Sequence, residues 1–372
     1  MSQDLLLASS HIYQDEYAGQ RINVANGFAI RIFSVLTFTM ALMPLTTFMR
    51  LKTVGQFSLV LISMIFSIFA VLNASIWNTE DHIQWFSGVG ICHVEASLRQ
   101  PLTVAFSLAM ILIPWRLIRM LRSETFPKPQ ILPDILFIWG IPILFILPCQ
   151  YLVMTNVYSI VPGFGCVPEF DDSWLSLVIV YIWWIVLLPV TFILSGIMCL
   201  AIYQKHLDFS ISFDDSSSSA TQRTYIKLYI LAIGIIAIYI PVQLTFIIQF
   251  VPSHFTTRSS FALLHSKNWN KPHFYHTSDD PQIQYQPWAY IAINFFIFLF
   301  YGFTGKAWAL YWQILQRLGL GKIFPTFDRP QPTWSTYDSC ESRISLLSYV
   351  DLVGYVTRKI ERQRKLSETQ TF

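Results

Sequence analysis

The sequence predicts an all-α membrane protein, a seven-transmembrane-helix bundle with its N-terminus outside and its C-terminus in the cytoplasm. Three observations support this prediction: the composition, the lengths of the apolar segments and the distribution of the basic residues. Of 372 residues, 53% are apolar and 13% are charged, and the mean hydropathy is +0.47. A soluble domain carries about 25% charged residues. Most of this chain must therefore face lipid rather than water.

Seven apolar segments are long enough to cross a bilayer, whose hydrocarbon core of about 30 Å needs roughly 20 residues of helix. Because backbone groups in lipid must be hydrogen-bonded within the segment, each segment is expected to be a helix. The segments are residues 27–49, 57–76, 94–118, 135–154, 174–203, 225–251 and 287–315. Residues 1–26 are expected to form an extracellular N-terminal segment, and the polar residues 316–372 a cytoplasmic tail that is largely disordered.

The third segment is unusual because its unbroken apolar part is short. To cross the membrane, its helix must extend through Glu95, Arg99 and Gln100. Polar groups at this depth are expected to face the interior of the bundle. Glu95 and Arg99 are four residues apart, so they share a helix face and can pair. They form either a structural ion pair in a hydrated vestibule or the wall of a site for a ligand that enters from outside.

The basic residues give the orientation of the bundle. The loops and helix ends on one side, together with the C-terminal tail, hold 19 Lys and Arg residues, whereas the other side holds 6. Cytoplasmic loops carry the excess of basic residues in membrane proteins. The N-terminus is therefore expected outside and the C-terminus in the cytoplasm.

Two cysteines fall on the predicted outer face. Cys92 lies at the start of the third segment, and Cys166 lies in the loop after the fourth. Because this face meets an oxidising compartment, a disulfide between them is chemically reasonable. The bridge would hold the loop over the mouth of the bundle.

Aromatic and polar residues gather at the predicted outer ends of the segments. They predict an aromatic and polar mouth above an apolar cleft, although an ordinary belt of interfacial aromatic residues explains many of the rings equally well. Besides Glu95 and Arg99, these residues are Trp77, Trp85, His93, Gln150, Tyr151 and Trp288.

Basic residues mark the predicted inner ends. They act either as a topology signal or as a docking surface for a cytoplasmic protein. The residues are Arg116, Arg119 and Arg122 at the end of the third segment, with Lys205, Arg223 and Lys227 beside the fifth and sixth.

A separate basic run lies in the C-terminal tail. Its charge suits contact with anionic membrane lipid, although a solvated, disordered tail explains the composition equally well. The run consists of Arg358, Lys359, Arg362, Arg364 and Lys365.

Other classes of function find little support in the sequence. Motifs for a zinc protease, a serine hydrolase or a phosphate-binding loop are absent, so we expect no enzyme and no cofactor. His273 and His276 lack a third partner for a metal. The net charge of +3 is too small to indicate nucleic-acid binding. A transporter or channel, or a scaffolding membrane protein, remains an alternative, although the inner halves of the segments offer no continuous polar path.

Three groups of residues resemble a known family, the fungal a-factor-type mating pheromone receptors, which are class D G-protein-coupled receptors. The first runs across the second and third helices, the second across the fourth helix and its following loop, and the third along the seventh helix. The resemblance as a whole covers roughly residues 28–312. They are Trp77, Asn78, Trp85, Gly88, Cys92 and Leu98, then Gln150, Tyr151, Gly165 and Cys166, and then Trp288, Phe295, Phe298, Gly302 and Tyr311.

The resemblance implies a multi-pass receptor of the plasma membrane. Its ligand would be a secreted peptide with a farnesylated, methyl-esterified C-terminal cysteine, and its partner a heterotrimeric G protein that feeds a mating signalling cascade. The outer residues named above, with Asn78, would then contact the pheromone, and the inner basic residues would contact the G protein. His93 stands where the family usually has an acidic residue. A homodimer is left open.

Overall fold

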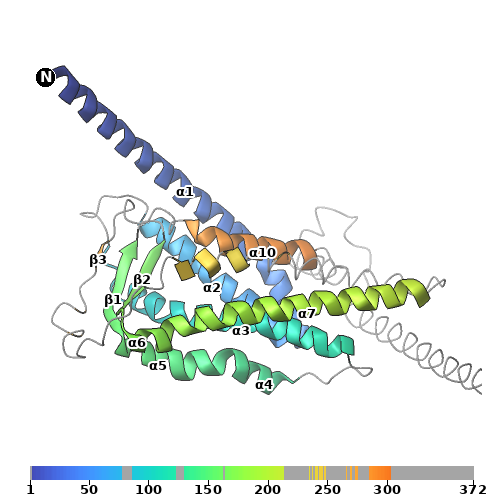
Figure 1. Cartoon of the computed structure of the whole chain (residues 1–372). Coiled ribbons are helices and arrows are strands. Elements are labelled where there is room, and N and C mark those ends of the chain that lie inside the picture. The colour runs from blue at the N-terminus through green and yellow to red at the C-terminus, as the bar shows by residue number, and fades with distance from the viewer. Residues whose placement is uncertain are drawn as a thin grey trace, which may run out of the picture. The chain divides into compact units, whose positions relative to one another are not determined.

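The computed structural model describes residues 2–77, 86–122, 130–161, 164–212 and 285–302. It also describes residues 234, 237, 239–241, 243–245, 247, 248, 265, 269, 273 and 274. From residue 24 onward, most of these residues have described side chains as well. Figure 1 shows that this part of the chain is mainly helical, with a small sheet at one end of the helices.

The long helices follow the apolar segments of the sequence. They are α1 (Ser2–Leu51), α2 (Val54–Ile76), α3 (Ile91–Arg122), α7 (Ile182–Ser212) and α10 (Pro287–Tyr301). α7 is preceded by α6 (Trp174–Ser176) and a π-helical stretch, Leu177–Tyr181. The fourth helix consists of α4 (Ile131–Ile135), the π-helical stretches Leu136–Gly140 and Pro142–Ile146, α5 (Leu147–Cys149) and a final 3-10 turn, Gln150–Leu152.

Within the described residues, five stretches are long and apolar enough to cross a membrane. They are Val24–Arg50, Val54–Ile76, Ile91–Arg119, Ile131–Leu152 and Trp174–Ala201, which overlap the first five predicted segments. The third does extend through Glu95, Arg99 and Gln100. The shorter apolar helix Pro287–Leu299 covers the start of the seventh predicted segment. Most of the sixth segment, the end of the seventh and the tail 316–372 lie outside the described residues.

α3 is the central helix of the described bundle. It packs against α2, α7 and both long strands of the sheet. In its most apolar stretch 72% of the residues are buried, compared with 33% in Val24–Arg50 and 17% in Ile131–Leu152. The first and fourth helices expose large apolar side chains such as Phe28, Ile32 and Leu144. These exposed faces suit contact with lipid.

The fourth helix departs from regular α geometry at its prolines. A proline has no N–H group, and its ring clashes with the carbonyl group four residues earlier in an α-helix. The π-helical stretches on either side of Ile141 widen the turns next to Pro142. Ile138, Pro142, Ile146 and Gln150 are all buried, so the widened helix points every fourth side chain toward the protein.

The described residues are mostly helical, as predicted, but a β-hairpin that the sequence did not indicate follows the fourth helix. Strand β1 (Met154–Val161) pairs antiparallel with β2 (Gly165–Phe170), and β1 pairs in parallel with the short strand β3 (His273–Phe274). β1 is rich in β-branched and aromatic residues, which favour strands. Pro168 is tolerated because β2 is an edge strand of this sheet.

Hydrogen bonds made by side chains join neighbouring helices inside the bundle. The Tyr239 hydroxyl lies 2.7 Å from Ser107 Oγ of α3, and Asn294 Nδ2 of α10 lies 3.0 Å from Ser67 Oγ of α2. Gln100 Nε2 of α3 donates to the Val180 carbonyl oxygen at 3.2 Å, within the π-helical stretch before α7. Such bonds keep polar side chains satisfied where no water is at hand.

Candidate functional site

The hairpin end, meaning the end of the bundle that carries β1 and β2, contains the cysteine pair. Cys92 of α3 and Cys166 of β2 form a disulfide, and both residues are fully buried. Gly88, with a φ of 71°, lies against this bridge. A Cβ atom at Gly88 would overlap the sulfur of Cys92, so the close approach of the chain requires glycine there. The disulfide fastens β2 directly to α3.

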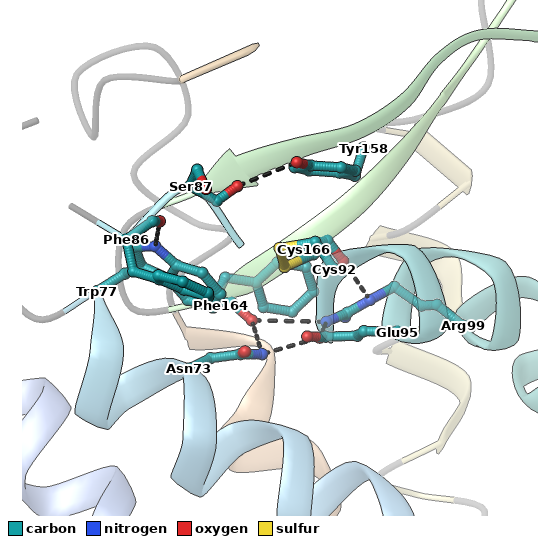
Figure 2. Close-up of a disulfide and its surroundings, with 10 residues drawn as sticks. All are labelled: Asn73, Trp77, Phe86, Ser87, Cys92, Glu95, Arg99, Tyr158, Phe164 and Cys166. Atoms are coloured by element: carbon teal, nitrogen blue, oxygen red, sulfur yellow. Dashed lines mark hydrogen bonds and ion pairs between the residues drawn. A yellow bond between two sulfur atoms is a disulfide. The ribbon is translucent and has the colours of Figure 1, made fainter. Parts of the chain in front are cut away.

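A buried polar network lies beside the disulfide (Figure 2). We call it the latch: the side chains of Asn73, Glu95 and Arg99 with the backbone carbonyl groups of Phe164 and Cys166. Asn73 Nδ2 donates to Glu95 Oε1 and to the Phe164 carbonyl oxygen, each at 2.8 Å. Arg99 forms an ion pair with Glu95 and donates through Nε to the Cys166 carbonyl oxygen at 3.1 Å. The latch therefore joins α2 and α3 to the hairpin.

The charges of the latch are withdrawn from solvent. The side chain of Glu95 is 1% exposed and that of Arg99 is 13% exposed. The guanidinium carbon of Arg99 lies 4.1 Å from the centroid of the Phe164 ring, which is a cation–π arrangement. Burying a charge is costly unless it is paired and hydrogen-bonded, and each charge here has partners of both kinds. In this state the hairpin covers both residues.

Other residues predicted at the outer end support the same hairpin. Trp77 is fully buried and donates through Nε1 to the Phe86 carbonyl oxygen at 3.1 Å. The ring of His93 lies edge-to-face against Tyr158 of β1, with centroids 5.1 Å apart. The Tyr158 hydroxyl donates to the Ser87 carbonyl oxygen at 3.0 Å, and burial raises the pKa of this hydroxyl.

Gln150 and Tyr151 connect the end of the fourth helix to α3. Gln150 is fully buried and donates through Nε2 to the Ser97 carbonyl oxygen at 2.7 Å. The hydroxyl groups of Tyr151 and Ser97 are also hydrogen-bonded. Tyr151 itself is exposed, and its carbonyl oxygen lies 3.0 Å from His265 Nε2. These contacts place part of the chain that precedes α10 beside the hairpin.

Trp288 lies apart from the latch, at the start of α10. Its Nε1 donates to Asn26 Oδ1 at 2.9 Å, and its ring lies 5.5 Å from that of Phe33 on α1. Of the remaining residues predicted to contact a ligand, Asn78 and Trp85 lie outside the described residues.

The opposite end of α3 carries the predicted basic residues. Arg116 forms an ion pair with Asp134 at the start of the fourth helix, and a terminal nitrogen of its side chain donates to Gln130 Oε1 at 3.2 Å. Arg119 is exposed. Arg223 and Lys227 lie outside the described residues, as do the side chains of Arg122 and Lys205.

Potential metal ligands do not cluster in the described part of the chain. No three His, Cys, Asp or Glu residues among those described could hold a metal ion together. His273 belongs to β3, and His276 lies outside the described residues.

Sequence reasoning missed Asn73, and it gave Gly165 no structural role beyond the family resemblance. Asn73 lies near the end of an apolar helix, where a single asparagine marks a polar position but does not indicate its partner. Gly165 has a φ of 101°, and a Cβ atom there would overlap the side-chain amide of Asn73. The sequence offered two signals for this position, the family resemblance and the predicted disulfide cysteine that directly follows Gly165.

Five apolar spans and a disulfide-linked polar network at one end define a helical membrane protein that crosses the bilayer several times. Residues 29–319 match the family model described as pheromone A receptor, and this chain belongs to that family. The resemblance seen in the sequence is thus confirmed. A similar protein is the pheromone a factor receptor of Saccharomyces cerevisiae (strain ATCC 204508 / S288c), which is 21% identical over 294 residues. The match covers 77% of this chain and 61% of the length of that relative.

Proposed function

We propose that this protein is a seven-helix G-protein-coupled receptor of the plasma membrane that binds a farnesylated peptide pheromone. Its family supports the receptor assignment. The sixth helix and the remainder of the seventh are assigned from the apolar segments 225–251 and 287–315. Basic residues are in excess at the end of the bundle opposite the hairpin and in the C-terminal tail, which favours an extracellular position for the hairpin end.

The observation that carries the proposal is the arrangement of the hairpin end. Exposed or half-buried side chains there, such as His93 and Tyr151, can meet a peptide, and Trp288 offers an aromatic face at the start of α10. Buried or largely buried residues hold the hairpin end together, since Trp77, Glu95, Arg99 and Gln150 all bond to the backbone or side chains around them. A peptide needs polar partners and a prenyl chain needs an apolar surface, and exposed apolar side chains such as Phe86, Val89 and Val94 lie at this end of the bundle.

The opposite end is proposed to contact a heterotrimeric G protein. Arg119 is exposed at the end of α3 and carries a positive charge suited to an acidic partner surface. Arg122, Lys205, Arg223 and Lys227 would extend this surface by their positions in the sequence. Pheromone binding would favour the bundle state that accepts the G protein, because a ligand shifts a conformational equilibrium only by its difference in affinity between the two states.

The test is to add synthetic peptides to cells that express the receptor and to measure nucleotide exchange on the G protein. Each peptide is supplied in a farnesylated, methyl-esterified form and in an otherwise identical form without the farnesyl group. We expect the farnesylated form of one peptide to act at far lower concentration than its partner. Equal potency of the two forms would contradict the lipopeptide assignment. Solute flux without nucleotide exchange would indicate a transporter instead.

A further inference from the structure

We propose that Asn73 is a positioning residue for pheromone binding, because it fixes the orientation of the hairpin above the bundle. This inference rests on the proposed function, since it concerns the element that we assign to the ligand site. Asn73 is fully buried in the last turns of α2, and the one predicted ligand position to which it bonds, Glu95, is itself buried beneath the hairpin. Its influence on a ligand must therefore pass through the hairpin.

The amide of Asn73 has one orientation that satisfies its surroundings. Its Nδ2 atom carries two hydrogens, and both are used, one toward Glu95 Oε1 and one toward the Phe164 carbonyl oxygen. If the amide were turned over, its oxygen would face two acceptors. The paired donors therefore fix both the side chain and the backbone of the hairpin turn at Phe164.

Gly165 completes this arrangement from the hairpin side. It is the first residue of β2 and has a left-handed φ of 101°, a conformation that glycine adopts without strain. Since a Cβ atom at this position would occupy the place of the Asn73 amide, the two residues fit together only when position 165 has no side chain. The contact is thus steric as well as polar.

The hairpin consequently has two adjacent attachments of different kinds. The disulfide at Cys166 joins it covalently to α3, and Asn73 joins the neighbouring residues Phe164 and Gly165 to α2. Arg99 adds hydrogen bonds from α3 to the Cys166 and Phe164 carbonyl groups, so the bridge and Arg99 both hold the hairpin on the α3 side. Asn73 holds it on the α2 side, and attachment to two helices rather than one limits how far the hairpin can tilt. Asn73 therefore helps to set the orientation of the hairpin at the ligand site.

The test uses Asn73→Ala and the milder Asn73→Ser, each compared at equal surface expression. We expect Asn73→Ala to raise the pheromone concentration for half-maximal response at least tenfold while the maximal response is retained, with Asn73→Ser in between. A second measurement needs no pheromone: the rate at which a membrane-impermeant reductant opens the disulfide. We expect this rate to rise several-fold in Asn73→Ala, because the hairpin above the bridge has gained freedom.

Gly165→Ala tests the steric half of the inference. Its matched control is Gly90→Ala, since Gly90 has a similar φ of 90° but nothing lies near the added Cβ atom. We expect Gly165→Ala to increase the reduction rate more than Gly90→Ala does. The disulfide of the double variant Asn73→Ala and Gly165→Ala should be reduced no faster than that of the more affected single variant, because both changes remove the same contact.

Asn294→Ala is the matched control for a buried asparagine, because Asn294 is also fully buried but bonds to Ser67 inside the bundle. It should leave the reduction rate unchanged. A wild-type reduction rate and wild-type potency in Asn73→Ala would overturn the inference, as would fully additive effects in the double variant. A wild-type receptor that responds to no pheromone would contradict the proposed function, whereas the reduction rates would still report on the attachment of the hairpin.

Discussion

The ion pair of the latch provides the most demanding prediction, made with the change Arg99→Met. Methionine keeps much of the length of the side chain but removes the charge, so the Glu95 carboxylate stays buried with Asn73 as its remaining side-chain donor. One oxygen of this carboxylate, Oε2, is already buried without a hydrogen-bond partner. The pair is largely buried, because the side chain of Arg99 is only 13% exposed and that of Glu95 is 1% exposed. Removing one member of a buried ion pair lowers the stability of the folded protein by about 3–5 kcal/mol.

Adding Glu95→Gln to Arg99→Met should recover about 2 kcal/mol of the loss, because the double variant buries no charge. The amide oxygen at position 95 can still accept the hydrogen bond from Asn73, whereas the carbonyl groups of Phe164 and Cys166 lose the Arg99 donor in both variants. The recovery should therefore be partial.

The assay is thermal unfolding of the purified receptor in detergent, followed by the loss of the monomer in size-exclusion chromatography. At about 2 °C for each kcal/mol in a protein of this size, Arg99→Met should lower the midpoint by roughly 6–10 °C. The double variant should lie a few degrees above Arg99→Met. A midpoint for Arg99→Met within a degree of the wild type would refute the buried-pair reasoning. A double variant less stable than Arg99→Met would refute it as well.

Three further predictions concern the rest of the described structure. Cys166→Ser removes a disulfide between residues 74 positions apart, and the greater chain entropy of the unfolded state should lower the stability of the fold by about 4 kcal/mol. The number of receptors at the cell surface should fall strongly as a result. Tyr239→Phe removes the bond to Ser107, whose hydroxyl keeps its bond to a backbone carbonyl, so the thermal midpoint should fall by only the equivalent of about 1 kcal/mol. Arg116→Asp places two carboxylates together and should lower surface expression, which the added change Asp134→Arg should restore; no restoration would argue against the pair.

Much of the helical architecture could be predicted because lipid imposes a simple rule on the sequence. A span must be apolar over roughly 20 residues, and the first five predicted segments overlap the five observed spans. The third segment shows why this works even where the pattern is interrupted. Glu95 and Gln100 are buried inside the protein, so they do not break the rule that lipid-facing positions are apolar.

The hairpin and its latch could not be predicted in the same way. Strand pairing depends on contacts between residues far apart in the chain. A strand of 8 residues outside the membrane spans is also too short to stand out among apolar segments of roughly 20 residues. Asn73 and Phe164 are 91 positions apart, and the sequence around either residue does not indicate that the two are in contact. The sequence did bring Glu95 and Arg99 together, because helical spacing is a local property, but it left their role open.

The widened turns of the fourth helix change how its sequence must be interpreted. In a regular α-helix, residues spaced by four advance about 400°, so Gln150 would lie about 120° around the axis from Ile138 after three such steps. The buried residues Ile138, Pro142, Ile146 and Gln150 nevertheless share the inward side, since the π-helical stretches reduce the rotation per residue. A helical-wheel projection of this segment is therefore out of phase by its last turn. It would assign Gln150 to the lipid, although that side chain anchors the helix to Ser97 of α3.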